Sequence, residues 1–390
     1  MPVKQAASIL STYAADTSGV CSALYELGGM TVMHDASGCN STYTTHDEPR
    51  WYDCDSMVYI SGLTEIDAIL GSDEKLIREI TETAEKLSPA FIAVAGTPIP
   101  MITGTDFPAI AAEVENRTGI PSFGFPTNGM YSYLRGAGMA FQTLAERMVD
   151  GTAVKTREPS VNLLGLTPLD FSVNGSAESI RRKLEAGGFR VVGSWAMGSS
   201  LAELRQAGRA WANLVVSASG LSAAKTLREK FHTPFVAGAP FGDRFSGKIL
   251  ADLNQAVRTG RSGISYAAPP TYGEPEIAVV GESVAAGSLA WAVAACTGKT
   301  ARAVCPLETD PELLPPGGAE LSGEEELAGF LRPYRIIVAD PLYRPVCPKG
   351  CRFVPLPHEA FSGRIFRKEI PDLAADFDGF FRKFFERGFA

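Results

Sequence analysis

Residues 71–98 read GSDEKLIREITETAEKLSPAFIAVAGTP, a helix-forming stretch that runs into the apolar segment AFIAVAG (90–96). Ser72 can cap the helix, and the carboxylates of Asp73 and Glu74 suit its first turn, where the helix dipole is positive. The apolar segment has the length and composition of a buried strand. This stretch therefore predicts a helix followed by a buried strand, the repeating unit of parallel α/β folds.

The same combination of apolar run and helical stretch recurs further along the chain. An apolar run begins at SVNLLGLTPLDF (160–171), and another begins at EIAVVGES (276–283), each followed by a helical stretch. The acidic segment 308–327, rich in proline and glycine, is expected to be a surface connection. We therefore predict an α/β protein of three Rossmann-like domains with parallel sheets around a central cleft. The expected domains are residues 1–155, 156–270 and 271–390.

Bulk composition narrows the choice of partners. The chain has 390 residues, more than one hydrophobic core usually supports, and a formal net charge of −8. It has no basic tail and no run of about 18 uncharged apolar residues, so neither nucleic acid nor a membrane is an expected partner. The first residues lack the apolar core of a signal peptide. We expect a cytoplasmic protein that acts on small molecules or other proteins.

Seven cysteines are scattered along the chain, unlike the dense framework of a disulfide-rich secreted domain. Cys21 follows Gly19 and Cys39 follows Gly38, and glycines in loops let the backbone approach inorganic sulfide. Two thiolates do not complete a four-iron cluster, but two copies of the chain around a twofold axis supply four. The sequence therefore predicts either a [4Fe-4S] cluster shared between the subunits of a homodimer or two small buried cysteines without metal.

Several blocks of sequence, taken in order, resemble component 1 of nitrogenase and its relatives. They are HDASGC (34–39), GLTEIDAILGSDEKLIREI (62–80) and the strand and loop that begin with PAFIAVAGTP (89–98). The resemblance continues through VNLLGLTPLDF and covers most of residues 15–260. This family contains nitrogenase molybdenum–iron protein subunits, cofactor-assembly scaffolds and reductases of tetrapyrroles. The resemblance implies three Rossmann-like domains and a partner that is an ATP-hydrolysing iron–sulfur reductase.

The resemblance also implies ligands. Cys21 and Cys39 match the first two cluster ligands of the family, and His34 matches the histidine before the second ligand. The backbone N–H of Gly38 is then a candidate hydrogen-bond donor to the cluster. Cys54, in WYDCDSM, is either an auxiliary ligand or a structural residue.

The chain departs from the family at the third ligand. Where the family carries a cysteine, this sequence reads Gly96-Thr97-Pro98, which favours a simple [4Fe-4S] cluster over a larger one. The segment SASGL (217–221) also lacks a cysteine, and His358 lacks the surrounding family pattern. A molybdenum–iron cofactor is therefore not expected.

A near match to a phosphate-binding loop occurs at GDRFSGKI (242–249). Ile249 stands where that motif needs a hydroxyl to bind magnesium, so nucleotide hydrolysis is not expected. Arg244 and Lys248 are candidates for contact with an acidic substrate in the central cleft, if the segment is a glycine-rich loop. The alternative is that these residues simply begin a solvated helix.

A second cysteine motif, CPKGC, places Cys347 and Cys351 four positions apart. This spacing differs from the two-residue spacer of common metal and redox motifs. The two thiols can ligate a second metal, form a redox pair or belong to an ordinary loop, and the sequence does not choose.

These observations lead to one functional expectation and two rivals. The chain is expected to be an oxidoreductase that accepts low-potential electrons from the reductase through the shared cluster and reduces a substrate bound between domains. Its length is closer to that of the tetrapyrrole-reducing members, so a macrocycle or another conjugated acceptor is a candidate substrate. The rivals are a non-catalytic scaffold for assembly or transfer of a cluster or metal cofactor, and a sugar- or nucleotide-binding protein with inert cysteines.

Overall fold

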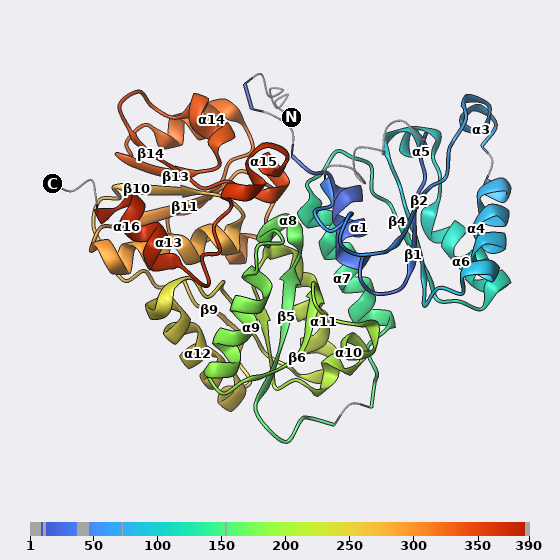
Figure 1. Ribbon diagram of the computed structural model, residues 1–390, viewed down its shortest axis with the longest axis horizontal. Coiled ribbons are helices and arrows are strands. Elements are labelled where there is room, and N and C mark those ends of the chain that lie inside the picture. The colour runs from blue at the N-terminus through green and yellow to red at the C-terminus, as the bar shows by residue number, and fades with distance from the viewer. Residues whose placement is uncertain (1–8, 11–12, 37–46, 72, 153, 387–390) are drawn as a thin grey trace.

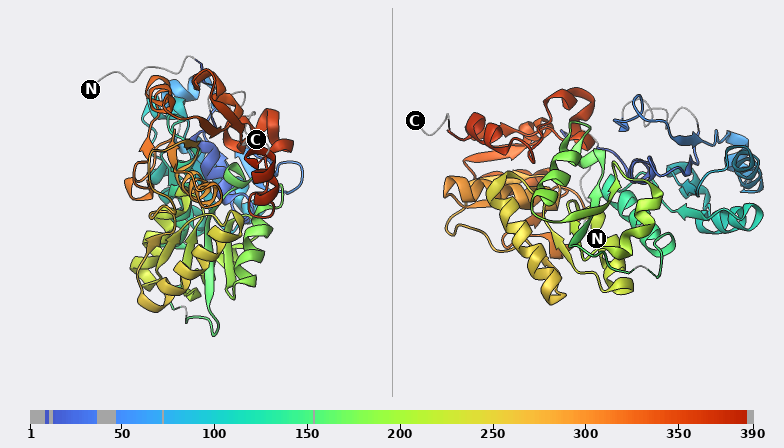
Figure 2. Two further views of the ribbon diagram at one scale, coloured as in Figure 1. Left: turned by 90° about the vertical axis from the view of Figure 1, so that its left-hand side faces the viewer. Right: turned by 60° about the horizontal axis from the view of Figure 1, so that its bottom comes forward.

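The computed structural model describes residues 9–10, 13–36, 47–71, 73–152 and 154–386. Three parallel sheets follow one another along the chain, with the second between the first and the third (Figure 1). The right-hand view of Figure 2 shows the same order, with the first and third sheets at opposite ends of the molecule. The expected α/β class with three parallel sheets is confirmed.

The first sheet has the strand order β2-β1-β3-β4. Its central strands are buried along their whole length, as their alanine, valine and methionine content requires. Its strands are β1 (Met30–Met33), β2 (Met57–Ile60), β3 (Ile92–Ala95) and β4 (Ser122–Phe125). Its helices are α1 (Asp16–Leu24), α3 (Glu65–Leu70), α4 (Asp73–Leu87), α5 (Pro98–Thr103), α6 (Phe107–Thr118) and α7 (Tyr133–Arg147). The helix and strand predicted within residues 71–98 are thus α4 and β3, while the predicted cap, Ser72, lies outside the described residues.

The second sheet has the order β6-β5-β7-β8-β9. Its strands are β5 (Ser160–Leu166), β6 (Arg190–Ala196), β7 (Ala212–Val215), β8 (Phe235–Ala237) and β9 (Gly263–Ile264). Its helices are α8 (Pro168–Phe171), α9 (Ser176–Ala186), α10 (Leu201–Arg205), α11 (Leu221–Phe231) and α12 (Gly242–Thr259). Ile180 and Leu184 lie one turn apart on α9 and are both buried, because this helix packs against β6.

The third sheet has the order β12-β11-β10-β13-β14. Its strands are β10 (Ile277–Val280), β11 (Ala301–Cys305), β12 (Ala319–Glu320), β13 (Ile336–Ala339) and β14 (Arg352–Pro355). Its helices are α13 (Ser283–Thr297), α14 (Glu324–Leu331), α15 (Glu359–Phe366) and α16 (Phe377–Phe384). The segment 308–327 is more than a connection, because it contains the edge strand β12 and the first turn of α14.

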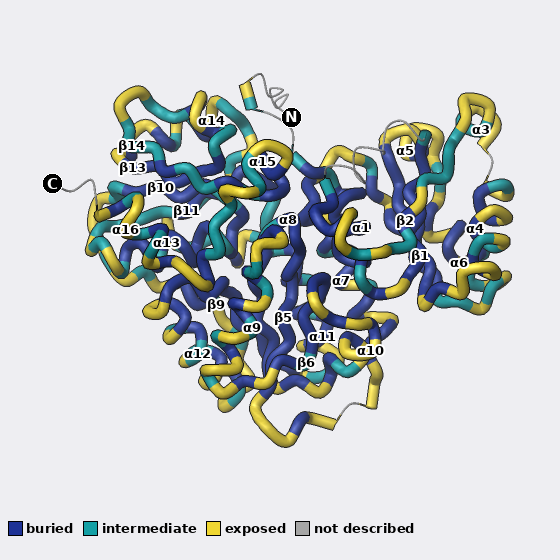
Figure 3. Tube along the Cα trace, in the orientation of Figure 1, coloured by how far each residue is buried: buried dark blue, intermediate teal, exposed yellow. Residues whose placement is uncertain are grey.

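The three sheets share their packing. One buried hydrophobic core has members from all three parts of the chain, from Val20 to Phe385. Helix α7 packs against α1 and α11, while α12 packs against α13 and α8 packs against α15. Figure 3 shows buried strands and exposed outer faces on the surrounding helices. Because the packing is continuous, the domain boundaries expected from the sequence stay predictions.

Two glycines explain how closely α1 approaches α7. A Cβ on Gly19 would overlap the backbone oxygen of Tyr133, and a Cβ on Gly136 would overlap the backbone oxygen of Asp16. The two backbones therefore touch only because both side chains are absent. Among the described helices, none combines the length and apolar composition needed to cross a bilayer.

Candidate functional site

The carboxyl end of the first sheet begins with His34, directly after β1. Its Nδ1 lies 2.8 Å from Ser61 Oγ, and its backbone oxygen accepts a hydrogen bond from Thr97 Oγ1 at 3.0 Å. Burial lowers the pKa of His34, which favours a neutral imidazole. These contacts fix the point from which the chain leads into residues 37–46. Gly38 and Cys39 fall in that segment, which lies outside the described residues.

Cys21 lies on helix α1 and not on a loop, so that part of the expectation was wrong. The nearby Gly19 serves the contact between α1 and α7 described above. The Cys21 side chain is fully buried beside Met33 and Val58. Burial, together with the negative charge of Glu48, raises the pKa of the Cys21 thiol far above its ordinary value. The thiol is therefore protonated at neutral pH in the isolated chain.

Cys54 packs against the same apolar cluster as Cys21 and is only half-buried. Burial raises the pKa of its thiol as well, and its Sγ lies 3.7 Å from the backbone oxygen of Asp55. The structure thus brings together two of the three cysteines that the sequence singled out for the cluster. Among the described side chains, no group of three or more histidine, cysteine or acidic residues is arranged to hold a metal ion.

This donor set fits an iron–sulfur cluster only in part. In this region the described residues supply one buried thiol, Cys21, and one half-buried thiol, Cys54, whereas a four-iron cluster needs four thiolates or equivalent ligands. The missing ligands must come from residues outside the described ranges or from a second chain. Binding would also have to displace the proton of Cys21, because thiolates and not thiols ligate metals.

A buried arginine, which the sequence did not mark, holds this region in place. Arg50 donates to Glu48 Oε1 at 2.7 Å, to Glu26 Oε1 at 2.8 Å and to the backbone oxygens of Ser22 and Ala196 at 2.8 and 3.0 Å. It therefore ties the segment that leads to Cys54 both to α1 and to the end of β6. Nothing in the local sequence predicts its burial, because an arginine in a polar stretch normally faces solvent.

The segment GDRFSGK is not a loop. Residues 242–248 form the first turns of α12, so the alternative of a helix start describes it correctly. Arg244 donates to the backbone oxygen of Ala295 at 2.6 Å, and Lys248 pairs with Asp252 at 2.9 Å. Neither lines the pocket described below, and their assignment to a substrate cleft stays a prediction.

The CPKGC motif lies between the 3-10 helix Pro341–Val346 and β14. Both thiols are free and half-buried, and Cys347 Sγ lies 3.3 Å from the backbone oxygen of Tyr343. Burial and the neighbouring Cys351 raise the pKa of Cys347 to about 12. The two thiols are thus neighbours, and the described residues add no third ligand beside them.

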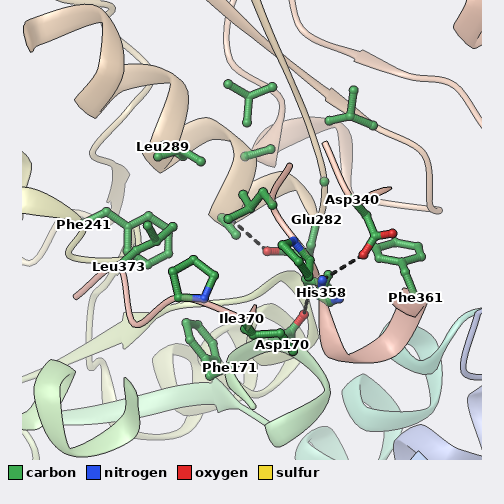
Figure 4. A pocket seen from close by; sticks show the side chains of 18 of the residues that line it. Asp170, Phe171, Phe241, Glu282, Leu289, Asp340, His358, Phe361, Ile370 and Leu373 are labelled. Atoms are coloured by element: carbon green, nitrogen blue, oxygen red, sulfur yellow. Dashed lines mark hydrogen bonds and ion pairs between the residues drawn. The ribbon is translucent and has the colours of Figure 1, made fainter. Parts of the chain in front are cut away.

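A second site lies between the second and third sheets, where three acidic residues and a histidine converge in one pocket (Figure 4). Each follows the carboxyl end of a different strand: Asp170 follows β5, Glu282 follows β10, Asp340 follows β13 and His358 follows β14. This is the edge at which parallel sheets bind ligands. The walls are mostly apolar, including Phe171, Phe241, Leu289, Phe361, Ile370 and Leu373.

His358 is the least satisfied polar group of this pocket. Its Nε2 lies 3.5 Å from Asp170 Oδ1, and neither ring nitrogen has a hydrogen-bond partner among the described residues. Its backbone N–H donates to Asp340 Oδ2 at 2.8 Å, which sets the position of the ring. Asp170 also accepts a hydrogen bond from the hydroxyl of buried Tyr133 at 2.5 Å.

Glu282 is fully buried and caps helix α13. It accepts hydrogen bonds from the backbone N–H groups of Ala218, Val284 and Ala285, each at 2.9 Å. Burial, together with the charge of Asp170, raises the pKa of Glu282 to about 7. The raised pKa favours the neutral carboxylic acid, a form that can donate a proton to a bound molecule.

The sequence did not reveal this pocket. No motif marks Asp170, Glu282 or Asp340, and His358 lacks the surrounding pattern of the family. A signal was available, because an acidic residue or histidine follows each of four apolar runs within a few positions. Only the strand order brings these four run ends to one edge.

The fold and these sites define an α/β protein of three parallel sheets with two candidate ligand sites, one at the carboxyl edge of the first sheet and one between the second and third. Residues 19–282 match the nitrogenase component 1 type oxidoreductases, and the chain belongs to that family. The expectation drawn from HDASGC and the blocks after it is confirmed at this level.

Individual relatives match parts of the chain. One of the subunits of light-independent protochlorophyllide reductase from Prosthecochloris aestuarii is 42% identical over 101 residues, which cover 25% of this chain and 19% of that protein. The nitrogenase iron-molybdenum cofactor biosynthesis protein NifE of Klebsiella pneumoniae is 25% identical over 213 residues, covering 50% of this chain and 45% of that protein. The chain thus spans less than half the length of these relatives.

The solved structure of nitrogenase Cp1 at pH 6.5 shares the fold. Its TM-score is 0.65, and the match covers 100% of this chain and 92% of that chain at 15% sequence identity. The likeness extends through the third sheet, of which only β10 lies within the sequence match to the family.

Proposed function

We propose that this protein is a nitrogenase-type oxidoreductase in which two copies of the chain hold a [4Fe-4S] cluster through Cys21 and Cys39 of each protomer. The observation that carries the proposal is the position of Cys21. It lies beside Met33 at the end of β1, and that strand leads through His34 into the segment that contains Cys39. When bound, the cluster would supply single electrons at low potential, delivered by an ATP-hydrolysing iron–sulfur reductase.

The described residues have defined tasks in this proposal. Cys21 and, as an auxiliary candidate, Cys54 hold the metal from the apolar cluster they share. His34 and Arg50 position the two segments that carry Cys39 and Cys54. The pocket at Asp170 and His358 takes the substrate, and its carboxyl groups and imidazole supply the protons that a reduction consumes.

Exposed apolar residues at the same edge support a protein interface. Ile66, Ile69 and Leu70 on α3 are 68%, 82% and 75% exposed, and Ile102 on the neighbouring α5 is 78% exposed. A gathered patch of large apolar side chains is expected where another protein binds. The homodimer and the docked reductase both require such a surface near the cluster.

Iron analysis of anaerobically purified protein tests the proposal. We expect about two irons per chain, because four irons are shared by two chains. Cys21→Ala and Cys39→Ala should each lose this iron. Cys305→Ala is the matched control, because Cys305 is also fully buried but lies in the third sheet. Full iron retention in both the Cys21 and Cys39 variants would reject the ligand assignment.

A scaffold for assembly of an iron–sulfur cluster or metal cofactor is the second candidate. The observation that favours it is the extent of the match to NifE, whose name describes cofactor biosynthesis and whose alignment covers twice as much of this chain as that of the protochlorophyllide reductase relative. Repeated turnover with reductase and ATP identifies an enzyme, whereas release of one cluster or cofactor per dimer identifies a scaffold.

A further inference from the structure

We infer that the pocket between the second and third sheets binds a small, largely apolar molecule with a protonated amine, and that it rejects carboxylates and phosphates. The inference rests on the proposed function only in taking this pocket as the substrate site. The binding chemistry itself follows from the residues that line it.

The charges around the pocket all have one sign. Asp170, Glu282 and Asp340 contribute three carboxyl groups, and none of the described residues that line the pocket is a lysine or an arginine. Anion sites in proteins depend on cationic side chains or on free backbone N–H groups. Here the N–H groups of Val284 and Ala285 at the start of α13 already donate to Glu282. An anionic ligand would therefore meet repulsion from the three carboxyl groups, and the single N–H of a neutral His358 ring would be a poor replacement for its water.

His358 supplies the complementary contact. Its side chain is 15% exposed, and both ring nitrogens are buried without a hydrogen-bond partner among the described residues. A buried polar atom left without a partner is costly, so a ligand that satisfies it gains affinity. A protonated amine can donate to a neutral imidazole nitrogen and lie within reach of Asp170, whose Oδ1 is 3.5 Å from Nε2.

The apolar side chains of the lining determine which kind of ligand body the pocket accepts. Phe171 and Phe241 come from the second domain, while Leu289, Ile370 and Leu373 come from the third part of the chain, and all present carbon to the pocket (Figure 4). The centre of a water-sized molecule can move through about 70 Å³ of it, room for several waters or a small ligand. A macrocycle that carries carboxylates would bring those charges against Asp170 and Glu282, so this pocket does not suit such a substrate.

Three probes with one hydrocarbon body test the inference by calorimetry at neutral pH: cyclohexylamine, cyclohexanol and cyclohexanecarboxylate. We expect the amine to bind at least about 100-fold more tightly than the carboxylate, because one charge at about 6 Å in an effective dielectric of 20 changes affinity by that factor. Cyclohexanol should fall between them. The assay needs neither cluster nor reductase, so its failure and the failure of the iron prediction are distinguishable.

Two variants test whether the preference for the amine arises in this pocket. Asp170→Asn should reduce the preference for the amine at least about tenfold, since it removes one of the charges that the amine meets. Asp106→Asn is the matched control, because Asp106 caps α6 in the first domain and asparagine is an equally good cap. Leu289→Trp should fill the pocket and abolish binding of the amine, and circular dichroism confirms that each variant is folded. Equal affinity for amine and carboxylate, absence of binding by all three probes, or an unchanged preference in folded Asp170→Asn protein would overturn the inference.

Discussion

The pocket carboxyl Glu282 makes the stability of the protein depend on pH in a predictable direction. Its pKa is about 7 in the folded chain, against an ordinary value of 4.5, because burial and the charge of Asp170 disfavour ionisation. Between these two values the folded state binds more protons than the unfolded state, so stability falls as pH rises. The contribution of Glu282 is therefore fully present below about pH 4.5 and lost as pH rises through about 7.

The size of this loss follows from the difference between the two pKa values. It corresponds to about 3 kcal/mol of unfolding free energy across the range. Glu282→Gln removes the titration, since an amide does not ionise. The amide also loses one of the acceptors used by the α13 backbone N–H groups, but that cost does not vary with pH.

Urea denaturation at a series of pH values from about 5 to about 8.5 measures the effect. The difference in unfolding free energy between wild type and Glu282→Gln should shift by about 2.5 kcal/mol over this range, in favour of the variant at high pH. Glu325→Gln, an exposed substitution of the same kind on α14, should follow the wild-type profile. If Glu282→Gln also follows it, the assignment of a raised pKa to Glu282 is wrong.

Two further substitutions test the packing that positions the cluster region. Gly136→Ala should destabilise the protein by about 1–3 kcal/mol in urea melts, because its Cβ would overlap backbone in α1. Gly138→Ala on the same helix should be neutral or stabilising by up to about 1 kcal/mol, since its Cβ would find a first neighbour only at 3.6 Å; equal effects of the two would refute the helix-contact argument. Arg50→Met should cost about 3–5 kcal/mol, because it removes the cation that pairs with the buried Glu48 carboxylate and the partly exposed Glu26 carboxylate. Arg117→Met, which breaks exposed ion pairs, should lower the unfolding free energy far less. A similar loss of stability in both variants would show that the buried Arg50 network contributes no more than surface ion pairs.

Local sequence patterns determined the fold class. The helix Asp73–Leu87 and the strand Ile92–Ala95 lie where acidic residues, helical spacing and an apolar run predict them. Such features act within a few residues, so they can be recognised without knowledge of the fold. The same reasoning placed SVNLLGL and EIAVVGE on or next to buried strands.

Predictions from local patterns were wrong where a glycine can serve more than one structural purpose. Gly19 suits a loop near a metal cluster, yet it serves a close contact between two helices. The glycines of GDRFSGK suggest a loop, yet both lie within helix α12. Phe245 and Ile249 are buried on one face of this helix, and their packing stabilises it in spite of the glycines. In each case the deciding partner lies on a distant element, which the motif does not reveal.

Neighbouring residues are enough to specify that this chain forms parallel α/β layers and that its N-terminal part carries the blocks of its family, because strands, helices and short motifs each depend on a few consecutive residues. Which polar residues act together depends on the three-dimensional packing. Asp170, Glu282, Asp340 and His358 meet because their strands run parallel and end at facing edges of two sheets. Strand order and the packing of one sheet on another depend on contacts across nearly two hundred residues, so no local pattern specifies them.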